Sequence, residues 1–336
     1  MAQWRAGRLV EPMKRPTTKQ VVSWAGTVLM IASLAFLARR LFVQSADIDV
    51  AVFASAGVVA GLVFVALLEG FGILMAGFNF RAMIKNVSGV LVDRPLGLLV
   101  YSISNLYKYI PGGVMYVVGR NRLAVETEDL GHPEVALSTV IEGALVAVAA
   151  IVIVLATVFD HARAHFSQME LPTAVIIIII AVFVIGGSVA FSFRHKISNG
   201  LRKLFKHMQV LRPLVLVKRF GFALLIMVLW SGTFLATLIV LGQEMSPGMA
   251  PTVMGLFLLA WLAGFLTPGA PSGLGVREII MLTFLGGILN ESILLSAMVI
   301  HRVVVAAGDV AAYGVAVGYA HIVKAKMPRQ TVPDMQ

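Results

Sequence analysis

The sequence contains no cysteine and few charged residues, and both shortages limit what the protein can be. Without cysteine the chain has no disulfide bonds, no thiolate ligands for a metal and no cysteine nucleophile. Charged residues make up 13% of the 336 residues, whereas a typical soluble domain contains about 25%. So few charges cannot cover the surface of a soluble protein of this length. The composition excludes a soluble enzyme, a disordered protein and a secreted disulfide scaffold.

Motifs for nucleotide or metal chemistry are also absent from the sequence. It has no P-loop, no H-E-x-x-H and no G-x-G-x-x-G. We therefore expect no enzymatic activity, no cofactor and no metal site. Lysine and arginine outnumber the acidic residues by 27 to 17, which gives a net charge of +10. In a membrane protein such an excess gathers in cytoplasmic loops and contacts anionic lipid, so we expect no nucleic-acid partner.

Apolar residues, in contrast, are abundant and occur in long runs. They make up 59% of the chain, and the mean hydropathy is +0.90. A helix that crosses a bilayer needs about 20 consecutive, mostly apolar residues. We therefore predict an all-α integral membrane protein with six full transmembrane helices. They are expected at 21–43, 50–78, 134–159, 171–193, 218–241 and 292–322.

The distribution of basic residues predicts which ends of the helices lie in the cytoplasm. The basic segment 1–20 precedes the first span, which we interpret as an uncleaved anchor with a cytoplasmic N-terminus. The loop 194–219 and the polar tail 323–336 are also rich in lysine and arginine and are expected in the cytoplasm. On this topology all but five of the 27 basic residues are cytoplasmic. The exceptions are Arg39, Arg40 and Arg163 in external loops, and Arg277 and Arg302 within membrane segments.

Two further apolar stretches, 95–120 and 251–287, are interrupted by proline and glycine. The interruptions read Pro111-Gly112-Gly113 and Pro268-Gly269-Ala270-Pro271. A helix breaks at proline, which lacks an N–H and clashes with the preceding turn. Basic residues flank the first stretch on both sides and are scarce around the second. We predict two re-entrant helical hairpins, the first entered from the cytoplasm and the second from outside.

The order of span, span, hairpin and span occurs twice, which divides the chain into repeats 21–159 and 160–322. In each repeat an arginine, Arg120 or Arg277, follows the proline of the hairpin by nine positions. Three crossings separate the repeats, so the second copy is inverted. Inverted repeats with Gly/Pro-interrupted segments point to a transporter site near the bilayer midplane. The alternative is that both interruptions are ordinary loops between short helices.

The residue types at the two interruptions suit an anion. Glycine lets backbone N–H groups approach a ligand closely, half-helix N-termini attract negative charge, and arginine binds phosphate through two hydrogen bonds. The candidate substrate-binding residues are Lys108, Pro111, Gly112, Gly113, Arg120, Glu142, Pro268, Gly269, Pro271, Gly273, Gly275, Arg277, Glu278 and Arg302.

Ionisable residues within membrane segments are costly, so they should face the protein interior and find partners. Glu142 and His301 are candidates for proton coupling. For each intramembrane charge the alternative is a structural ion pair, which we favour for Glu69 and Asp309 because we place them toward helix ends. The expected pairs are Glu142 with Arg277 or Arg120, and Arg302 with Glu278 or Asp309.

Several of these segments resemble the flippase-like family, also called the lysylphosphatidylglycerol synthase transmembrane-domain family. The resemblance covers about residues 20–322 and is most specific in the second hairpin. Ser272 stands where the family often has glycine, and Met115 stands near a frequent tryptophan, which puts the headgroup in doubt more than the fold. The resembling segments are 105–112, 263–278, Glu142 and the pair His301-Arg302.

The resemblance implies a bacterial or archaeal inner-membrane protein that moves an anionic phospholipid or a lipid-linked headgroup between leaflets, as a flippase or scramblase. Longer members carry a soluble aminoacyltransferase domain, and we expect this chain to be a stand-alone member without it. One alternative is a non-transporting membrane subunit that works with lipid- or glycolipid-biosynthesis enzymes. A weaker one is a small-anion secondary transporter. The sequence leaves the lipid, the coupling ion and a homo-oligomeric state open.

Overall fold

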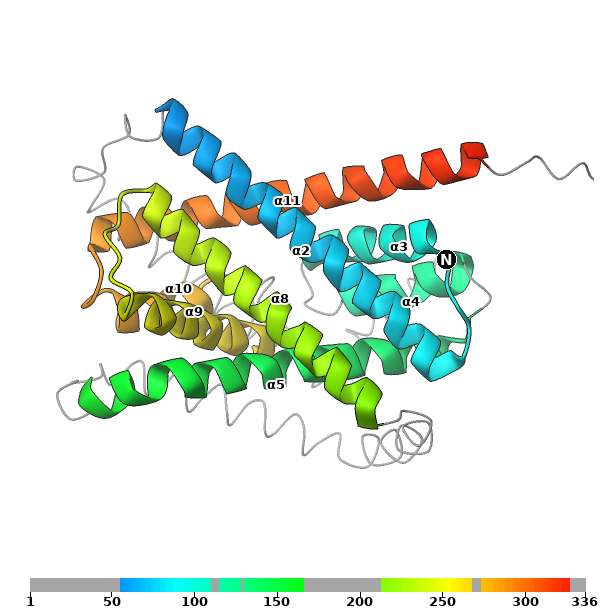
Figure 1. The fold of residues 1–336 in the computed structure, drawn as a ribbon, viewed down its shortest axis with the longest axis horizontal. Coiled ribbons are helices and arrows are strands. Elements are labelled where there is room, and N and C mark those ends of the chain that lie inside the picture. The colour runs from blue at the N-terminus through cyan, green and yellow to red at the C-terminus, as the bar shows by residue number, and fades with distance from the viewer. Residues whose placement is uncertain (1–54, 110–114, 128–129, 166–212, 268–272, 327–336) are drawn as a thin grey trace, which may run out of the picture.

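The structure is a computed structural model that describes residues 55–109, 115–127, 130–165, 213–267 and 273–326. Within these ranges every regular element is a helix, and there is no strand (Figure 1). The helices are α2 (Ala56–Ser88), α3 (Arg94–Leu106), the 3-10 turn η3 (Tyr107–Tyr109), α4 (Met115–Thr127), α5 (His132–His165), α8 (Pro213–Val240), α9 (Met249–Leu266), α10 (Val276–Leu285) and α11 (Glu291–Lys326).

Five described helices are long and apolar enough to cross a membrane: α2, α5, α8, α9 and α11. This confirms the prediction of an all-helical, multi-pass membrane protein. Four of the five correspond to predicted spans, and the other two predicted spans, 21–43 and 171–193, lie outside the described residues. The fifth, α9, is 18 residues long and occupies part of the stretch that the sequence analysis assigns to the second hairpin.

Helix α2 ends ten residues later than the sequence predicts, at Ser88 instead of residue 78. Polar side chains in this extension find partners inside the protein. Asn79 accepts a hydrogen bond from Arg219 of α8 at 2.8 Å, and Arg81 donates to the carbonyl of Val92 at 2.5 Å. The helix then stops at Gly89, whose φ of +77° is readily adopted only by glycine.

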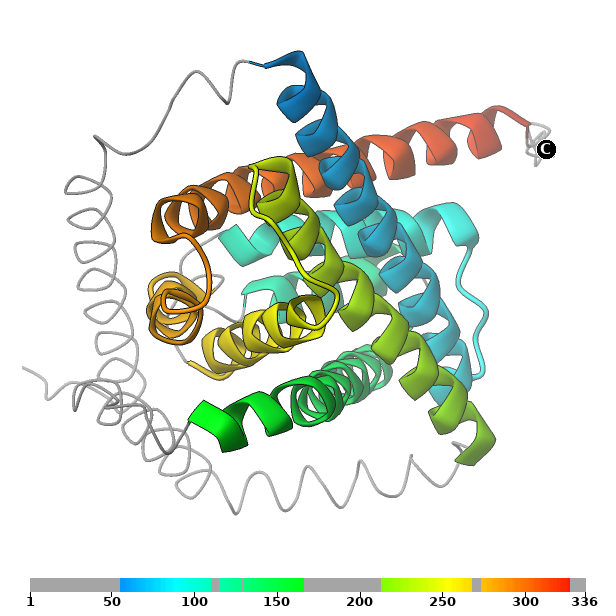
Figure 2. The ribbon, with the colours of Figure 1, turned by 60° about the vertical axis from the view of Figure 1, so that its left-hand side comes forward.

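Helices α2 and α8 lie side by side across the front of the molecule, as Figures 1 and 2 both show. Helix α11 crosses behind α2, and α5 crosses behind α8 (Figure 1). The short helices α3 and α4 fill one end of the space between α11 and α5, and α9 and α10 fill the other end. Helices from the two halves of the chain are therefore interleaved around one shared core.

The contacts between helices repeat in the two halves of the chain. Helix α2 packs on α3 and α11, and α8 correspondingly packs on α9 and α5. Likewise α3 contacts α4 and α11, whereas α9 contacts α10 and α5. The pattern of contacts among these eight helices is unchanged when α2, α3, α4 and α5 are exchanged with α8, α9, α10 and α11. Such an arrangement is expected of two related halves joined about a two-fold axis.

Helices α2 and α11 cross closely at Gly70 and Gly308. A Cβ atom added to Gly70 would lie 2.8 Å from the carbonyl oxygen of Gly308, and one added to Gly308 would lie 2.7 Å from that of Ala66. Only glycine permits this approach of two backbones. The crossing holds Glu69, which precedes Gly70, and Asp309, which follows Gly308, in the interior of the protein.

Large apolar side chains are exposed along the outer faces of the long helices. They include Phe64 and Leu67 of α2, Leu155 of α5, Leu225 of α8 and Val303 of α11, each at least 57% exposed. A soluble monomer rarely exposes so much contiguous apolar surface. Contact with lipid explains these faces, since lipid tails solvate apolar side chains.

Candidate functional site

A pocket lies where η3, the turn that directly follows α3, meets α8, α9, α10 and α11. It encloses about 410 Å³ of empty space, its open mouth included. Its walls combine aromatic and aliphatic side chains with three charged ones. The lining residues are Tyr109, Phe234, Phe257, Arg277, Glu278, Met281, Met298, His301, Arg302 and Val305.

Arg277 carries the unpaired charge in this pocket. It is the second residue of α10, which begins directly after Gly275, and the φ of +87° at Gly275 permits the sharp turn into the helix. Its guanidinium carbon lies 5.2 Å from the ring centre of Phe257, a cation–π contact. Within the described ranges Arg277 has no acidic side chain close enough for an ion pair, so its charge is available to an anion in the pocket.

Two glycines hold the stem of Arg277 in place. Gly264 near the end of α9 and Gly273 before α10 are in contact, and the Arg277 side chain lies against both. A Cβ atom on Gly264 would lie 2.7 Å from Cγ of Arg277 and 2.9 Å from Cα of Gly273. Gly273 also has a φ of +68°, a conformation that other residues rarely adopt. Both glycines are therefore needed for the observed position of Arg277.

Replacing Gly264 with alanine should displace Arg277. We expect Gly264→Ala to lower the free energy of unfolding by about 1–3 kcal/mol, because the new methyl group overpacks the site. We also expect it to abolish any function that depends on Arg277. The matched control is Gly221→Ala in α8, where an added Cβ meets no atom within 4 Å. Unfolding curves in detergent that are the same for both variants would contradict this packing.

Arg302 is also in the pocket, but Glu278 neutralises it. The Arg302 Nε–H donates to Oε1 of Glu278 at 2.7 Å, and Nη2 donates to the same oxygen. The other carboxylate oxygen of Glu278 accepts the backbone N–H of Gly275 at 2.7 Å. Glu278 is 2% exposed. It therefore joins the start of α10 to α11, and the structure selects Glu278 from the two partners that the sequence left open for Arg302.

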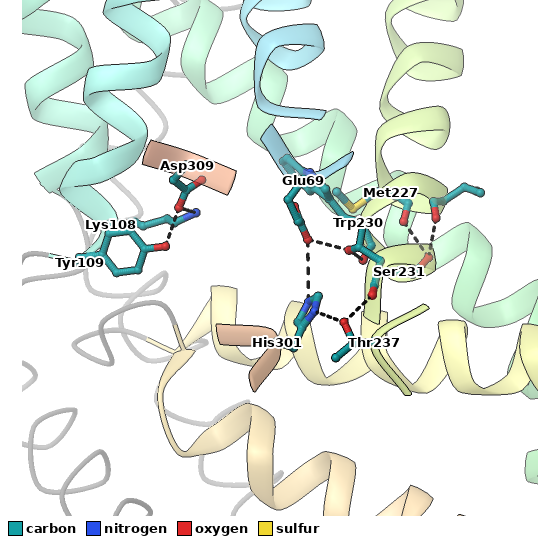
Figure 3. A network of polar contacts seen from close by, with 11 residues as sticks. Glu69, Lys108, Tyr109, Met227, Trp230, Ser231, Thr237, His301 and Asp309 are labelled. Atoms are coloured by element: carbon teal, nitrogen blue, oxygen red, sulfur yellow. Dashed lines mark hydrogen bonds and ion pairs between the residues drawn. The ribbon is translucent and has the colours of Figure 1, made fainter. Parts of the chain in front are cut away.

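His301 lines the pocket and is paired with a buried carboxylate, Glu69 (Figure 3). His301 Nε2 lies 3.8 Å from the Glu69 carboxylate, and its Nδ1 lies 3.1 Å from the Thr237 hydroxyl. The Thr233 hydroxyl lies 2.6 Å from Glu69 Oε1, to which it donates. The His301 ring also packs edge-on against Phe234 and Phe257. Three helices, α2, α8 and α11, meet at this network.

Asp309 connects the end of α3 and the η3 turn to α11. It is 1% exposed and accepts three contacts, from Asn105 Nδ2 at 2.6 Å, the Tyr109 hydroxyl at 2.5 Å and Lys108 Nζ at 2.6 Å. Figure 3 shows Lys108 and Tyr109 both directed at this carboxylate. Lys108, predicted to bind substrate, is thus paired within the protein. Tyr109 is held at the pocket wall by the same contact.

Arg120 and Glu142 form a separate, buried ion pair. Arg120 Nη1 lies 2.7 Å from Glu142 Oε2, and Arg120 Nε donates to the Ser104 hydroxyl at 3.0 Å. The rings of Phe80 and Tyr101 cover the guanidinium, at 4.8 and 4.0 Å from its carbon. Arg120 is 4% exposed and Glu142 6%. Neither lines the pocket, so the two arginines at matching sequence positions have different surroundings.

The structure thus brings together only part of the predicted site. Arg277, Glu278, Arg302 and His301 line one pocket, with Gly273 and Gly275 beside Arg277. Arg120, Glu142 and Lys108 are engaged in ion pairs elsewhere. The remaining predicted residues lie outside the described ranges: Pro111, Gly112, Gly113, Pro268, Gly269 and Pro271.

Two placements made from the sequence are wrong, because Glu69 and Asp309 do not lie toward helix ends. Glu69 lies in the middle part of α2 and Asp309 in the middle of α11, beside the crossing of these two helices at Gly70 and Gly308. The sequence analysis also passed over Gly264, Thr233 and Thr237. Gly264 lies in the segment 263–278 that the sequence analysis singled out, which was a signal for this residue, whereas single threonines in apolar helices carry no signal.

Comparison with known proteins adds no family assignment. A scan against models of protein families gives no match, and a search of curated proteins finds no significant relative. The conclusions about function below therefore depend on the site and on the arrangement of the helices.

Proposed function

We propose that this protein is a lipid flippase or scramblase that moves an anionic phospholipid or lipid-linked headgroup between the leaflets of a bacterial or archaeal inner membrane. One observation carries the proposal. Arg277, a cation with no ion-pair partner among the described residues, faces a pocket formed by apolar helices. A charge in such a position is costly, so its presence points to a role in binding or transport.

The chemistry of the pocket suits a phosphate group. A guanidinium binds phosphate oxygens through two parallel hydrogen bonds. The Phe234, Phe257 and Met281 side chains form apolar walls beside it. A phospholipid joins a charged phosphate headgroup to apolar acyl chains through glycerol, and this pocket offers a cation next to apolar surface. The pocket thus supports binding of a headgroup at membrane depth.

The arrangement of the helices supports alternating access. The repeated contact pattern of the two halves is the pattern expected of repeats 21–159 and 160–322. Residues from both broken segments, Tyr109 and Arg277, meet at the pocket. In transporters with inverted repeats the site lies between the repeats, and rocking of one repeat against the other exposes it to each side in turn.

We further propose the complete topology of six spans and two re-entrant hairpins, with both termini in the cytoplasm. Helices α3 and α4 have 13 residues each, so each rises only about 20 Å, too short for the hydrocarbon core of about 30 Å. Helix α10 has 10 residues and is shorter still. Their contacts with neighbouring helices, α3 with α4 and α9 with α10, fit two hairpins.

The absence of cysteine makes this topology directly testable. Single cysteines at Gly112 and Ala270, at the predicted tips of the two hairpins, should react with membrane-impermeant thiol reagents from opposite faces of the membrane. Cysteines at Arg8 and Arg329, in the predicted cytoplasmic ends, calibrate the inner face. Labelling of Gly112→Cys and Ala270→Cys from the same face would contradict the inverted repeat.

Translocation by the purified protein tests the function itself. We expect proteoliposomes to move a fluorescent anionic phospholipid between leaflets at a rate well above that of protein-free liposomes. A non-transporting subunit of a biosynthetic complex would give no lipid movement, and a small-anion transporter would give flux of inorganic phosphate without lipid movement. An imposed pH gradient distinguishes a proton-coupled flippase from a scramblase. His301 is the proposed proton carrier, since Glu142 is held by Arg120.

A further inference from the structure

We propose that the pocket selects a headgroup with a single negative charge, a phosphodiester in preference to a phosphomonoester, and that Glu278 sets this limit by neutralising Arg302. The inference rests on the proposed function, since it concerns which lipid that function moves. The limit depends on which charges around the pocket are already neutralised by ion pairs within the protein.

Two of the cations next to the pocket have fixed partners. Arg302 donates two hydrogen bonds to one oxygen of Glu278, as described above. Lys108 lies 2.6 Å from Asp309, which is 1% exposed and has no other cation beside it among the described residues. Each of these pairs is neutral as a unit. A ligand therefore gains little net attraction from either.

The third ionisable pair around the pocket is also balanced. His301 lies 3.8 Å from Glu69, and the Thr233 hydroxyl donates a hydrogen bond to the same carboxyl group. In the resting pocket we assign one proton to this pair, because a net charge of either sign would be costly in the protein interior. Whether that proton is on the imidazole or on the carboxyl group, His301 and Glu69 together carry no net charge.

Arg277 is then the only described group of the pocket whose charge remains uncompensated. A phosphodiester, with one negative charge, would neutralise it. A phosphomonoester has a second ionisation near pH 6, so at pH 7.5 it carries close to two charges. Its extra charge would have no counterpart in a pocket with apolar walls, where an unbalanced charge is expensive.

The wild-type protein provides the first test. Proteoliposomes would contain acyl-labelled phosphatidylglycerol, a diester, or phosphatidic acid, a monoester, with the same labelled chain. At pH 7.5 we expect phosphatidylglycerol to move at least about tenfold faster, as an uncompensated charge in the pocket implies. At pH 5 the ratio of the two rates should approach one, because phosphatidic acid then carries a single charge. The phosphatidylglycerol rate at each pH corrects for effects of pH on the protein.

A charge-restoring pair of variants provides the second test. Glu278→Gln adds one positive charge to the pocket and should raise the rate of phosphatidic acid relative to phosphatidylglycerol at pH 7.5 by about tenfold or more. The double variant Glu278→Gln/Arg302→Gln returns the pocket to its original charge and should restore the original ratio. Glu126→Gln, at an exposed ion pair on α4, is the matched control.

The outcomes separate this inference from the function on which it rests. If the wild type moves neither lipid, the proposed function itself is wrong. If it moves both at the same rate at pH 7.5, or if their ratio does not change between pH 7.5 and 5, charge selection is wrong and the transport function stands. The wild-type measurement decides the question even where Glu278→Gln does not fold.

Discussion

Arg277→Ala should abolish lipid translocation and leave the protein folded. The side chain makes no ion pair with the described residues, so its removal leaves no buried carboxylate without a partner. Binding of an anion, however, would lose its main cation. Removing one partner of a desolvated charge pair costs about 2–5 kcal/mol, which corresponds to a loss of about 30-fold or more in rate. Initial rates of lipid movement in proteoliposomes, at matched protein content, measure the effect.

Two further variants make this result interpretable. Arg277→Lys keeps the charge and loses the two-pronged geometry, so it should retain part of the activity. Arg122→Ala removes an exposed arginine that pairs with Glu126 four residues later, and it should transport as the wild type does. Unfolding curves should agree for all four proteins. Wild-type transport by Arg277→Ala would overturn the assignment of the pocket.

Arg120→Gln, unlike Arg277→Ala, should strongly lower the stability of the protein. It would leave the carboxylate of Glu142, which is 6% exposed, without its cation. Breaking a buried ion pair by removing one partner typically costs about 3–5 kcal/mol. The aromatic rings of Phe80 and Tyr101 would lose their cation–π contact as well. Thermal unfolding in detergent should show a clearly lower midpoint than the wild type.

The double variant Arg120→Met/Glu142→Leu tests whether the loss of stability in Arg120→Gln comes from the unpaired carboxylate of Glu142. Apolar side chains of similar volume can replace a buried ion pair with little loss of stability or a gain. We expect the double variant to unfold close to the wild-type temperature and to keep lipid translocation. A stable, folded double variant that transports no lipid would show that Arg120 or Glu142 acts on the substrate, as the sequence analysis predicted.

The contrast between these two arginines illustrates what a sequence pattern can and cannot predict. Both follow a Pro-Gly interruption by nine residues, and from spacing alone they are equivalent. Their surroundings differ because different partners face them across the helix interfaces. Glu142 of α5 reaches Arg120, whereas Phe257 of α9 lies beside Arg277. The ion pair of the second half has its charges the other way round: the acid, Glu278, lies on the short helix α10, and its cation, Arg302, lies on α11.

Much of the fold follows from the sequence alone, for a local physical reason. A helix that crosses lipid satisfies its backbone hydrogen bonds internally and needs a continuous apolar run, so four of the spans were predicted from composition along the chain. The breaks in the two shorter segments follow equally from local chemistry. Helix ends were less predictable, because α2 continues through Asn79 and Arg81 when tertiary partners accept their polar groups.

The site, in contrast, was decided by tertiary structure, because its contacts join residues far apart in the chain. Asp309 accepts a hydrogen bond from the hydroxyl of Tyr109, which lies 200 positions away in the sequence. Glu69 accepts one from the hydroxyl of Thr233, 164 positions away. No local pattern encodes such a distance. The sequence offered Arg302 two carboxylates and Glu142 two arginines, and helix packing selected one partner for each. The same packing left Arg277 without an ion-pair partner among the described residues, and that unbalanced charge is the basis of the proposed binding site.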